Sequence, residues 1–413
     1  MKTRMKFRLL HKEVEWNNHR NPELMVIGLG LGILWLAVFQ KFDHSPTGDA
    51  LLGFHIVVRA IVGLVALWSM VSLVRGGQLT LPAGLLLSLW GWLFLRDFLN
   101  GDLLLHIVIG GAIVVIALHA HSLTSRDLSN FYLVVPVGFA LASVLFVLFD
   151  GESSFRPDGY SDFFGELALG QFMGVATHPN QFAPVMALGI LIVFTRSRPS
   201  GLWLAMAGFF AVGLILSGSD GTIAALSVAL VVAGLLHDWL NRSSKKPPWR
   251  SLIAISAALA IAIGSFVLIA TRGIANFSTG RTRIWSSYVE PARDAGLFGF
   301  GHFPEIVDNP VFNEIAVQFR DPHNAFLATQ VTGGYLGSIL QLAFWVSVLI
   351  AVWRMSPSPQ KNLAGGIIAF LLVAGIVESH LYLGLRMFIP FFVLLVALAG
   401  QDRRETRLSR SRQ

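Results

Sequence analysis

The chain has 413 residues, of which 54% are hydrophobic and only 13% are charged. A water-soluble domain carries about 25% charged residues, so this composition excludes an ordinary soluble protein. The formal net charge of +7 does not indicate a nucleic-acid partner, because the basic residues lie in short segments between apolar runs instead of forming one basic surface. The chain has no cysteine, which excludes disulfides, thiolate metal sites and cysteine nucleophiles.

The apolar runs predict about twelve transmembrane helices, since a bilayer crossing needs about 20 mostly apolar residues. The predicted fold class is therefore all-α, a polytopic integral membrane protein. The helices are expected to begin near Leu24, Leu51, Leu81, Leu103, Phe131, Gln171, Leu202, Thr222, Leu252, Asn324, Leu363 and Leu383. The expected organisation is a tail at 1–23, helices one to nine at 24–271, a large loop between helices nine and ten at 272–322, helices ten to twelve at 323–400 and a second tail at 401–413.

The distribution of basic residues predicts the orientation in the membrane. Residues 1–20 are rich in Lys and Arg and lack the apolar core of a cleavable signal peptide. Every predicted loop on the same side carries at least one basic residue, whereas most acidic residues fall on the other side. Because basic loops stay in the cytoplasm, both termini are expected to be cytoplasmic and the loop at 272–322 periplasmic.

Polar residues within the predicted helices lie at their outer ends. They are His55, Arg59, Arg96, Asp97, His106, His178, Asp220, Glu378, His380 and Arg386. A charged group inside a bilayer costs about 2.5–3.5 kcal/mol and usually faces a cavity or a partner, although snorkelling or local pairing accounts for any one of them alone. Their shared depth favours an enzyme that meets its substrate from the outer leaflet over a transporter, whose polar groups lie near the midplane.

The long loop contains a predicted helix with the sequence TRIWSSYVEPARD. Its apolar face is expected to hold Ile284, Trp285, Tyr288 and Val289. Thr279 or Thr282 is expected to cap its start, and Pro291 disfavours its continuation. Arginines beside a helix N-terminus form an anion site; the candidates here are Arg281, Arg283, Arg293 and Arg320. The alternative is a solvated charged surface.

Two further segments follow in this region. Residues 299–302, with the sequence GFGH, predict a tight turn and lack the spacing of a nucleotide-binding loop. Pro322 then leads into the tenth helix, with His323 at its N-terminus. The positive end of the helix dipole and the nearby arginines disfavour protonation of His323, so it is a candidate proton acceptor. Capping or packing is the alternative role.

Taken together, GRTRIW, GFGHF and DPHNAFLATQVTGGYLG resemble the signature of the O-antigen ligase and polysaccharide polymerase family, and GVATHPNQFA resembles the His-x-Asn motif of its exopolysaccharide polymerase branch. The resemblance covers roughly residues 170–337. It departs from the family at residues 217–221, where Ser-Gly-Ser-Asp-Gly replaces the frequent Ser-x-Ser-Arg-Gly. Asp220 thus stands where the family frequently has an arginine that faces phosphate. The resemblance implies either that Arg59, Arg96 or Arg386 compensates or that the donor binds differently.

The resemblance implies a glycosyltransferase in the bacterial inner membrane, with a periplasmic active site and no metal, nucleotide or other cofactor. Its donor is a glycan linked to undecaprenyl diphosphate, and its acceptor is another glycan (polymerase) or lipid A–core (ligase). His323 is the expected base and Arg281 the expected diphosphate ligand. The expected substrate-binding residues are Arg59, Arg283, Arg320, Arg386, His178, Asn180, Asn324 and Asp220. The alternatives are peptidoglycan polymerisation, a lipid-linked oligosaccharide flippase or secondary transporter, and a membrane scaffold.

Overall fold

A computed structural model describes the parts of the chain that hold most of the expected site. The described residues are 8–9, 12–13, 64, 80–99, 125–149, 151, 154–156, 171–176, 178–196, 200–240, 281–301, 311–312, 314, 316, 322–378, 391–392, 394–396 and 398–399. They contain helices and four two-residue strands, β1 (Arg8–Leu9), β2 (Lys12–Glu13), β3 (Phe155–Arg156) and β4 (Gln171–Phe172). The strands pair as β1 with β2 and β3 with β4, so the all-α expectation holds apart from two small pairings.

The helices mostly begin where the apolar runs predict. They are α3 (Leu81–Leu99), α5 (Ser125–Phe149), α6 (Pro179–Phe194), α7 (Gly201–Ser217), α8 (Asp220–Leu240), α11 (Arg281–Asp294), α13 (Ala325–Arg354) and α14 (Pro359–Val377). The start expected near Gln171 is wrong, because Gln171 pairs in β4 and Gly174 takes a left-handed φ of 56°. The starts near Leu24, Leu51, Leu103, Leu252 and Leu383 lie outside the described residues.

Three of the described helices are long and apolar enough to cross a membrane, namely Asp220–His237 within α8, α13 and α14. Along α13, large apolar side chains such as Ile339, Leu342 and Trp353 are exposed. A continuous exposed apolar surface of this kind is stable only against lipid or a partner. These features indicate an integral membrane protein, while the number of crossings and the side of each loop stay predictions.

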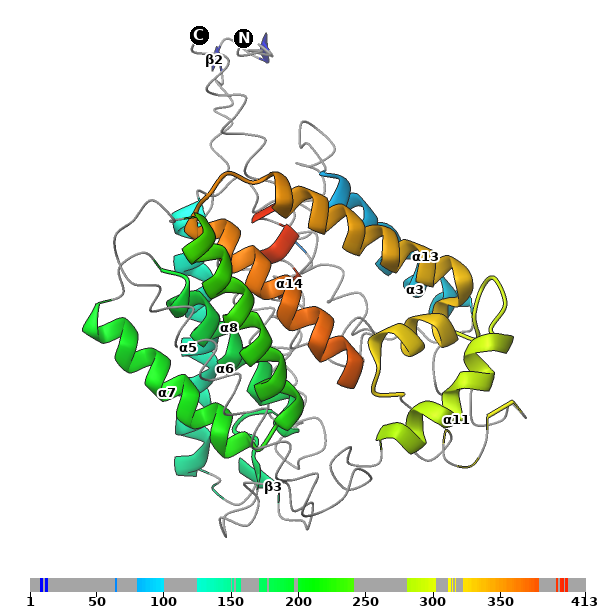
Figure 1. Cartoon of the computed structure of the whole chain (residues 1–413), viewed down its shortest axis with the longest axis horizontal. Helices are drawn as coiled ribbons and strands as arrows, with labels where there is room; N and C mark the ends of the chain where they lie inside the picture. Colours follow the sequence, from blue (N-terminus) through cyan, green and yellow to red (C-terminus); the bar gives the residue numbers. More distant parts are fainter. Residues whose placement is uncertain are drawn as a thin grey trace.

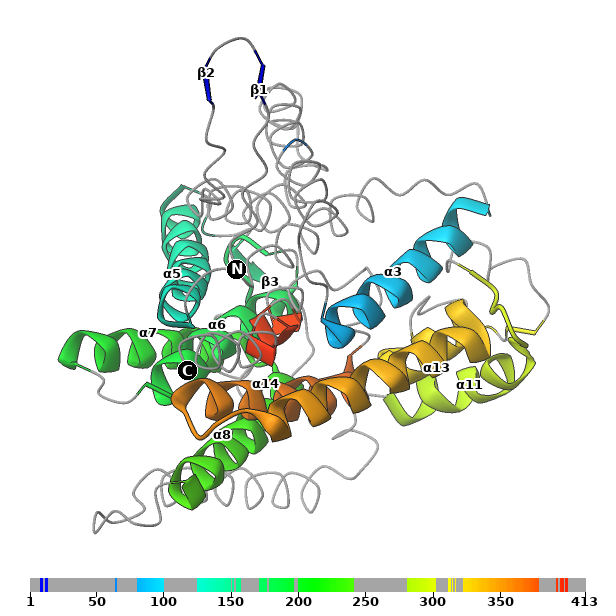
Figure 2. The ribbon, with the colours of Figure 1, turned by 90° about the horizontal axis from the view of Figure 1, so that it is seen from above.

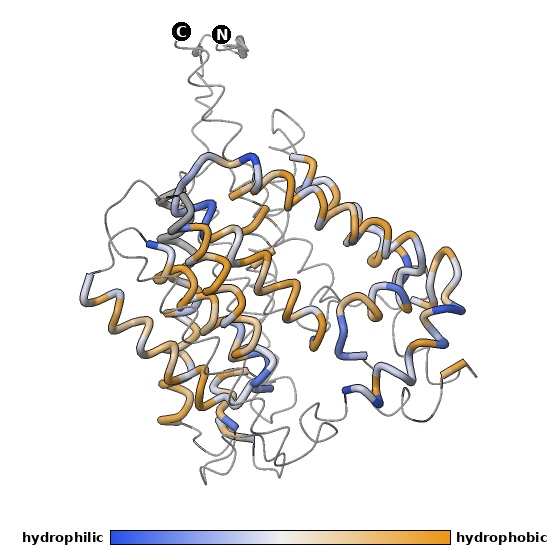
Figure 3. Tube along the Cα trace, in the orientation of Figure 1, coloured by the Kyte–Doolittle hydropathy of each residue, from blue (hydrophilic) through white to orange (hydrophobic). Residues whose placement is uncertain are grey.

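The helices pack in pairs that bring distant segments together. α13 and α14 are consecutive and joined by a short turn, while α14 packs against α8, α13 against α3, and α6 against α7 (Figures 1 and 2). The contact between α14 and α8 is close because Gly366 has no side chain; a Cβ there would lie 3.3 Å from the Ala229 carbonyl oxygen. Hydrophilic residues gather on α11 and at the beginnings of α8 and α13 (Figure 3).

The helix α13 is broken at Gly334, whose φ of 63° and ψ of −161° are not helical. The loop after α11 pairs with the backbone on both sides of the break. Phe300 N donates to Val331 O at 2.8 Å, and Tyr335 N donates to Gly296 O at 3.0 Å. These bonds satisfy backbone groups that the break removes from the helical ladder, so a short half-helix at 325–333 points in its own direction.

Two side chains of α3 hold the broken region from the other side. Trp92 Nε1 donates to the Gly333 carbonyl oxygen at 2.9 Å, and Arg96 Nη2 donates to the Gly299 carbonyl oxygen at 2.8 Å. Arg96 therefore has a structural partner, and its expected compensation for the missing arginine at position 220 stays a prediction. The two contacts tie the half-helix and the loop after α11 to a helix more than 200 residues away in sequence.

Gly334→Ala is expected to destabilise the protein. The left-handed φ costs about 1–3 kcal/mol for a non-glycine residue, and a Cβ would lie 2.6 Å from the Leu297 carbonyl oxygen. The matched control is Gly91→Ala in α3, where a Cβ meets nothing within 4 Å and a gain of about 0.5–1 kcal/mol is expected. Thermal unfolding in detergent compares the two variants, and equal stability would contradict the assigned break.

Candidate functional site

The buried carboxylate of Glu378 lies at the centre of the candidate site. Glu378 caps the C-terminus of α14, and its side chain is only 6% exposed. Both features are unfavourable for a carboxylate, since burial removes it from water and the helix C-terminus carries a partial negative charge. Its ionised form therefore needs strong partners nearby.

Three side chains from separate segments provide them. Arg281 Nη2 donates to Oε1 at 3.0 Å, and Asn180 Nδ2 donates to the same oxygen at 2.6 Å. His323 Nδ1 lies 3.6 Å from Oε2, an ion-pair distance. Burial alone raises the pKa of Glu378, but the interaction with His323 and the charges of Arg281 and the histidines outweigh it and lower this pKa below its usual value.

The helix α11 brings Arg281 to Glu378 and also contacts His323. Arg281 and Trp285 are four residues apart and therefore lie on one face of the helix. Trp285 Nε1 approaches the His323 carbonyl oxygen at 3.5 Å, and Tyr288 OH donates to the Ala316 carbonyl oxygen at 3.0 Å. The helix predicted here is confirmed, and its start at Arg281 places that guanidinium beside its own positive N-terminus.

Three details of this helix differ from expectation. Thr282 lies inside α11 and does not cap it, while Thr279 lies outside the described residues. Pro291 also lies inside, because a proline near the helix end removes only one backbone bond and its ring is buried in the packing. Val289 is 50% exposed, so the buried face consists of Ile284 and Tyr288 with Trp285 partly covered.

His323 and Asn324 form the junction before α13. His323 has a φ of 47°, a left-handed conformation that is uncommon outside glycine and often found at functional sites. Asn324 is the N-cap, with Oδ1 accepting from Phe326 N and Leu327 N at 3.0 Å each. Its Nδ2 donates to the Ile376 carbonyl oxygen at 3.0 Å. This tie to the last turn of α14 sets His323 beside Glu378.

The His-x-Asn segment at the start of α6 and the Ser-Gly-Ser-Asp segment before α8 also lie close to Glu378. His178 caps α6, and its Nδ1 accepts from Asn180 N at 3.1 Å. Ser219 Oγ, just before α8, donates to Asn180 Oδ1 at 2.9 Å. Asp220 is the first residue of α8 and is half-buried; an acid at this position is stabilised by the helix dipole.

Four helix N-termini thus converge near one carboxylate, those of α6, α8, α11 and α13. Each N-terminus carries a partial positive charge of about half an elementary charge. With Arg281 they add positive charge beside the negative Glu378 and Asp220, at the end of the helices where hydrophilic residues gather (Figure 3). Helix N-termini bind anions such as phosphate groups.

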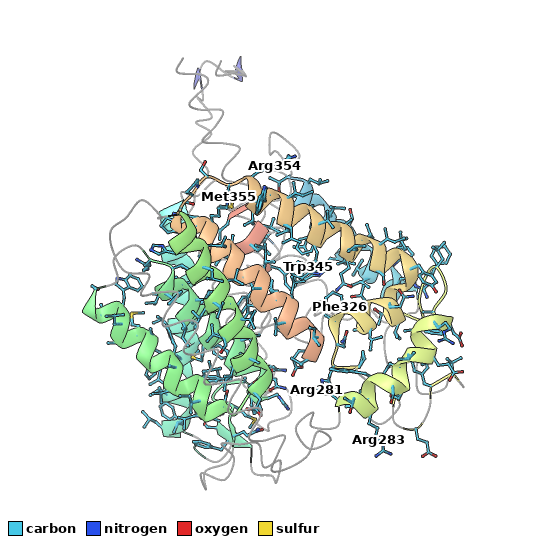
Figure 4. All side chains as sticks on the ribbon, viewed as in Figure 1. Arg281, Arg283, Phe326, Trp345, Arg354 and Met355 are labelled. Atoms are coloured by element: carbon cyan, nitrogen blue, oxygen red, sulfur yellow. The ribbon has the colours of Figure 1, made fainter. Side chains whose placement is uncertain are left out.

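The structure brings together most of the predicted site residues that it describes. Arg283 is exposed on α11 and points away from Glu378, whereas Arg281 points toward the end of α14 (Figure 4). Arg59, Arg320 and Arg386 lie outside the described residues.

Glu378 is the residue that sequence reasoning missed as a site residue. The sequence did contain a signal for it. Glu378 is an acidic residue directly after a long apolar segment, at the same expected membrane depth as the other polar residues.

Comparison with known proteins gives the same answer as the motifs. Residues 204–342 match the family described as O-antigen ligase. An O-antigen ligase of Pseudomonas aeruginosa is 27% identical over 200 residues, 47% of this chain and 46% of that protein. The exopolysaccharide production protein ExoQ of Rhizobium meliloti is 25% identical over 235 residues, 50% of this chain and 53% of that protein. The chain thus spans about half the length of each of these curated relatives, and these similarities agree with the resemblance recognised from the motifs.

Glu378→Gln is expected to lower the thermal stability at neutral pH, because it leaves Arg281, which is only 18% exposed, without its ionic partner, at a cost of about 3 kcal/mol. A lowered pKa in the folded state means that the ionised carboxylate stabilises the fold above the unfolded pKa of about 4.3 and loses this effect as pH falls through the folded value. The difference in melting temperature between wild type and variant should therefore shrink toward acid pH. A difference independent of pH would contradict the ionised assignment.

Proposed function

We propose that this chain, which is similar to the O-antigen ligase family over residues 204–342 and to two curated relatives, transfers or polymerises a glycan linked to undecaprenyl diphosphate on the periplasmic face of the bacterial inner membrane. The observation that carries the proposal is the buried carboxylate of Glu378, which contacts both a cationic side chain and a histidine. An anion ligand beside a proton acceptor is the arrangement that transfer from a diphosphate requires.

Arg281 holds the diphosphate in this proposal. A sugar bonded to a diphosphate carries a good leaving group, and the protein has to stabilise the negative charge that develops on it. A hydrogen bond to a charged group contributes about 1.5–3 kcal/mol, and the convergent helix N-termini add to it. Because the arginine frequent in the family is Asp220 here, Arg281 carries more of this charge, with Arg59, Arg320 and Arg386 as further proposed ligands.

His323 is the proposed base. With Nδ1 facing the Glu378 carboxylate at 3.6 Å, a neutral imidazole keeps its proton on Nδ1 and leaves Nε2 to accept one. The acceptor hydroxyl oxygen then attacks the anomeric carbon, its proton passes to Nε2, and the bond to the diphosphate oxygen breaks to release undecaprenyl diphosphate. Attack from the face opposite the leaving group inverts the anomeric centre. No metal, nucleotide or other cofactor takes part in the proposed reaction.

The acceptor is the second substrate of the proposed reaction. The printed names of the relatives point to two kinds of product, since one is an O-antigen ligase and the other an exopolysaccharide production protein. The His-x-Asn motif at His178 and Asn180 favours another glycan as acceptor, hence a polymerase, and lipid A–core is the alternative.

The proposed orientation places the site in the periplasm and the turn between α13 and α14 in the cytoplasm. The chain has no cysteine, so single cysteines report accessibility without background. Arg283→Cys in α11 is expected to react with a membrane-impermeant maleimide in spheroplasts, whereas Ser356→Cys, in the exposed turn at the opposite end of α13, should react only after the inner membrane is opened. The reverse pattern would contradict the orientation.

Arg281→Lys and His323→Ala are expected to abolish or strongly reduce transfer while the protein remains in the membrane at normal levels. Lysine keeps a positive charge beside the buried Glu378 carboxylate, whereas Arg281→Ala would leave that carboxylate without its cation and destabilise the fold. The matched control is Arg283→Ala, which removes an exposed arginine two residues along the same helix and should have a mild effect. Product formation and the level of membrane-inserted protein are measured together. Loss of the protein itself in the first two variants would indicate a structural role and overturn the catalytic assignment.

The proposal is tested with purified protein and a short glycan on undecaprenyl diphosphate, without added metal. Product length and carrier release are followed with and without lipid A–core, with His323→Ala as the inactive control. Long chains without lipid A–core indicate a polymerase, and a single transfer only in its presence indicates a ligase. If wild type and control both leave the donor intact, the transferase proposal fails and transport of the same lipid becomes the function to test.

A further inference from the structure

We propose that Asn180 and Ser219 are positioning residues, which hold the Glu378 carboxylate in the orientation that presents one of its oxygens to His323. Asn180 was expected from the sequence to bind substrate, and the positioning role is proposed in place of that contact. The importance of this role for catalysis rests on the proposed function. The inference starts from a chain of side-chain contacts that reaches from α8 through α6 to α14 and ends at the proposed base.

The contacts form a continuous chain from Ser219 to His323. Ser219 Oγ donates to Asn180 Oδ1 at 2.9 Å, and Asn180 Nδ2 donates to Glu378 Oε1 at 2.6 Å. Glu378 Oε2 then lies 3.6 Å from His323 Nδ1. Ser219 is buried, and its hydroxyl also lies 2.9 Å from Thr222 Oγ1.

Both ends of the Asn180 amide are used in this arrangement, so its orientation is specified. If the amide rotated by half a turn, its oxygen would face the carboxylate oxygen of Glu378 and repel it. The carboxylate of Glu378 specifies the amide orientation because it can only accept, and the Ser219 hydroxyl secures it by donating its proton to Asn180 Oδ1 while its oxygen can accept from Thr222 Oγ1. An amide with both of its ends bonded to protein has fewer groups left for a sugar or a phosphate.

The position of Ser219 follows from the local backbone. Gly218 ends α7 with a left-handed φ of 62°, and α8 begins at Asp220. Gly218 and Ser219 are therefore the two residues between the helices, and the Ser219 side chain faces Asn180. This assigns a physical task to the second serine of the Ser-x-Ser motif, which the departure at Asp220 leaves unchanged in this chain.

Several charged or titratable groups of the described residues surround Glu378. Arg281 of α11 bonds the same oxygen as Asn180, His323 before α13 faces the other, and His178 at the start of α6 adds a nearby charge when protonated. Asp220 begins α8 beside Ser219. Asn180 also touches the carboxylate but is uncharged, so Asn180→Asp keeps nearly the same shape while it replaces the NH₂ donor with a second acceptor and adds a negative charge.

The test follows the protonation of Glu378 by infrared titration of the full-length protein in detergent, with its carboxyl band identified by its loss in Glu378→Gln. In Asn180→Asp two carboxylates lie within hydrogen-bonding distance and cannot both ionise, so the protonation midpoint should rise by at least about one pH unit. Ser219→Ala should raise it by less. The matched control is Ser227→Ala, another buried serine of the same helix region whose hydroxyl bonds only its own helix at Ile223 O, and its titration should superimpose on wild type.

The conservative variant Ser219→Thr keeps the hydroxyl and should restore the wild-type midpoint even if its added methyl group lowers the rate. If Ser219→Ala does not fold, Asn180→Asp and Ser219→Thr still decide the question. Midpoints in Asn180→Asp and Ser219→Ala that equal that of Ser227→Ala would overturn the proposal.

Transfer activity gives the second readout. A positioning role predicts that Asn180→Asp and Ser219→Ala move the acidic side of the pH–rate profile to higher pH and lower kcat. The KM for the lipid-linked donor should stay unchanged. A raised KM with an unshifted profile would instead mean that Asn180 binds the donor, and would overturn the proposal. If wild type shows no transfer at all, the proposed function fails, while the infrared titration still decides whether these two residues position Glu378.

Discussion

The candidate site depends on how one buried carboxylate is stabilised. Glu378 stands at the negative end of α14 and is almost fully covered, so removing its partners would leave an uncompensated buried charge at a cost of several kcal/mol. The fold meets this requirement with Arg281, Asn180 and His323 from three separate segments. One carboxylate thereby links the ends of α6, α11 and α14 to the residue that precedes α13, in addition to the apolar packing between these helices.

The break in α13 makes this placement compatible with a membrane span. A continuous helix would carry His323 along the axis of the segment 335–354, whereas the left-handed Gly334 lets the half-helix 325–333 turn independently. The backbone groups released by the break are satisfied by the loop after α11, as apolar surroundings require. Trp92 and Arg96 of α3 close the same junction. The half-helix that follows the proposed base is thus held by hydrogen bonds from both sides.

The replacement of an arginine by Asp220 bears on substrate selection. In the proposed site, the positive charge available to a diphosphate comes from Arg281 and the helix N-termini, and Asp220 reduces the net positive potential near α8. The acid also stabilises the N-terminus of its own helix, so the substitution favours the local fold while it weakens anion binding. A donor bound by fewer arginines is expected to depend more on contacts with its glycan and its lipid.

Local periodicity and the length of a bilayer crossing were enough to predict the apolar segments, several helix starts, the helix that carries Arg281 and the place of His323 just before a helix. The resemblance to a family was likewise visible in short motifs. The contact of Glu378 with these motifs emerged from the folded structure, since its hydrogen bond with Asn180 spans 198 residues and no local pattern encodes such a pairing. The break at Gly334 could not be predicted either. Two adjacent glycines in an apolar segment are also typical of a continuous helix that packs closely against a neighbour, and only the hydrogen bonds from the loop after α11 distinguish the two cases. Local sequence specifies which elements form; the compensation of a buried charge helps to specify how they meet.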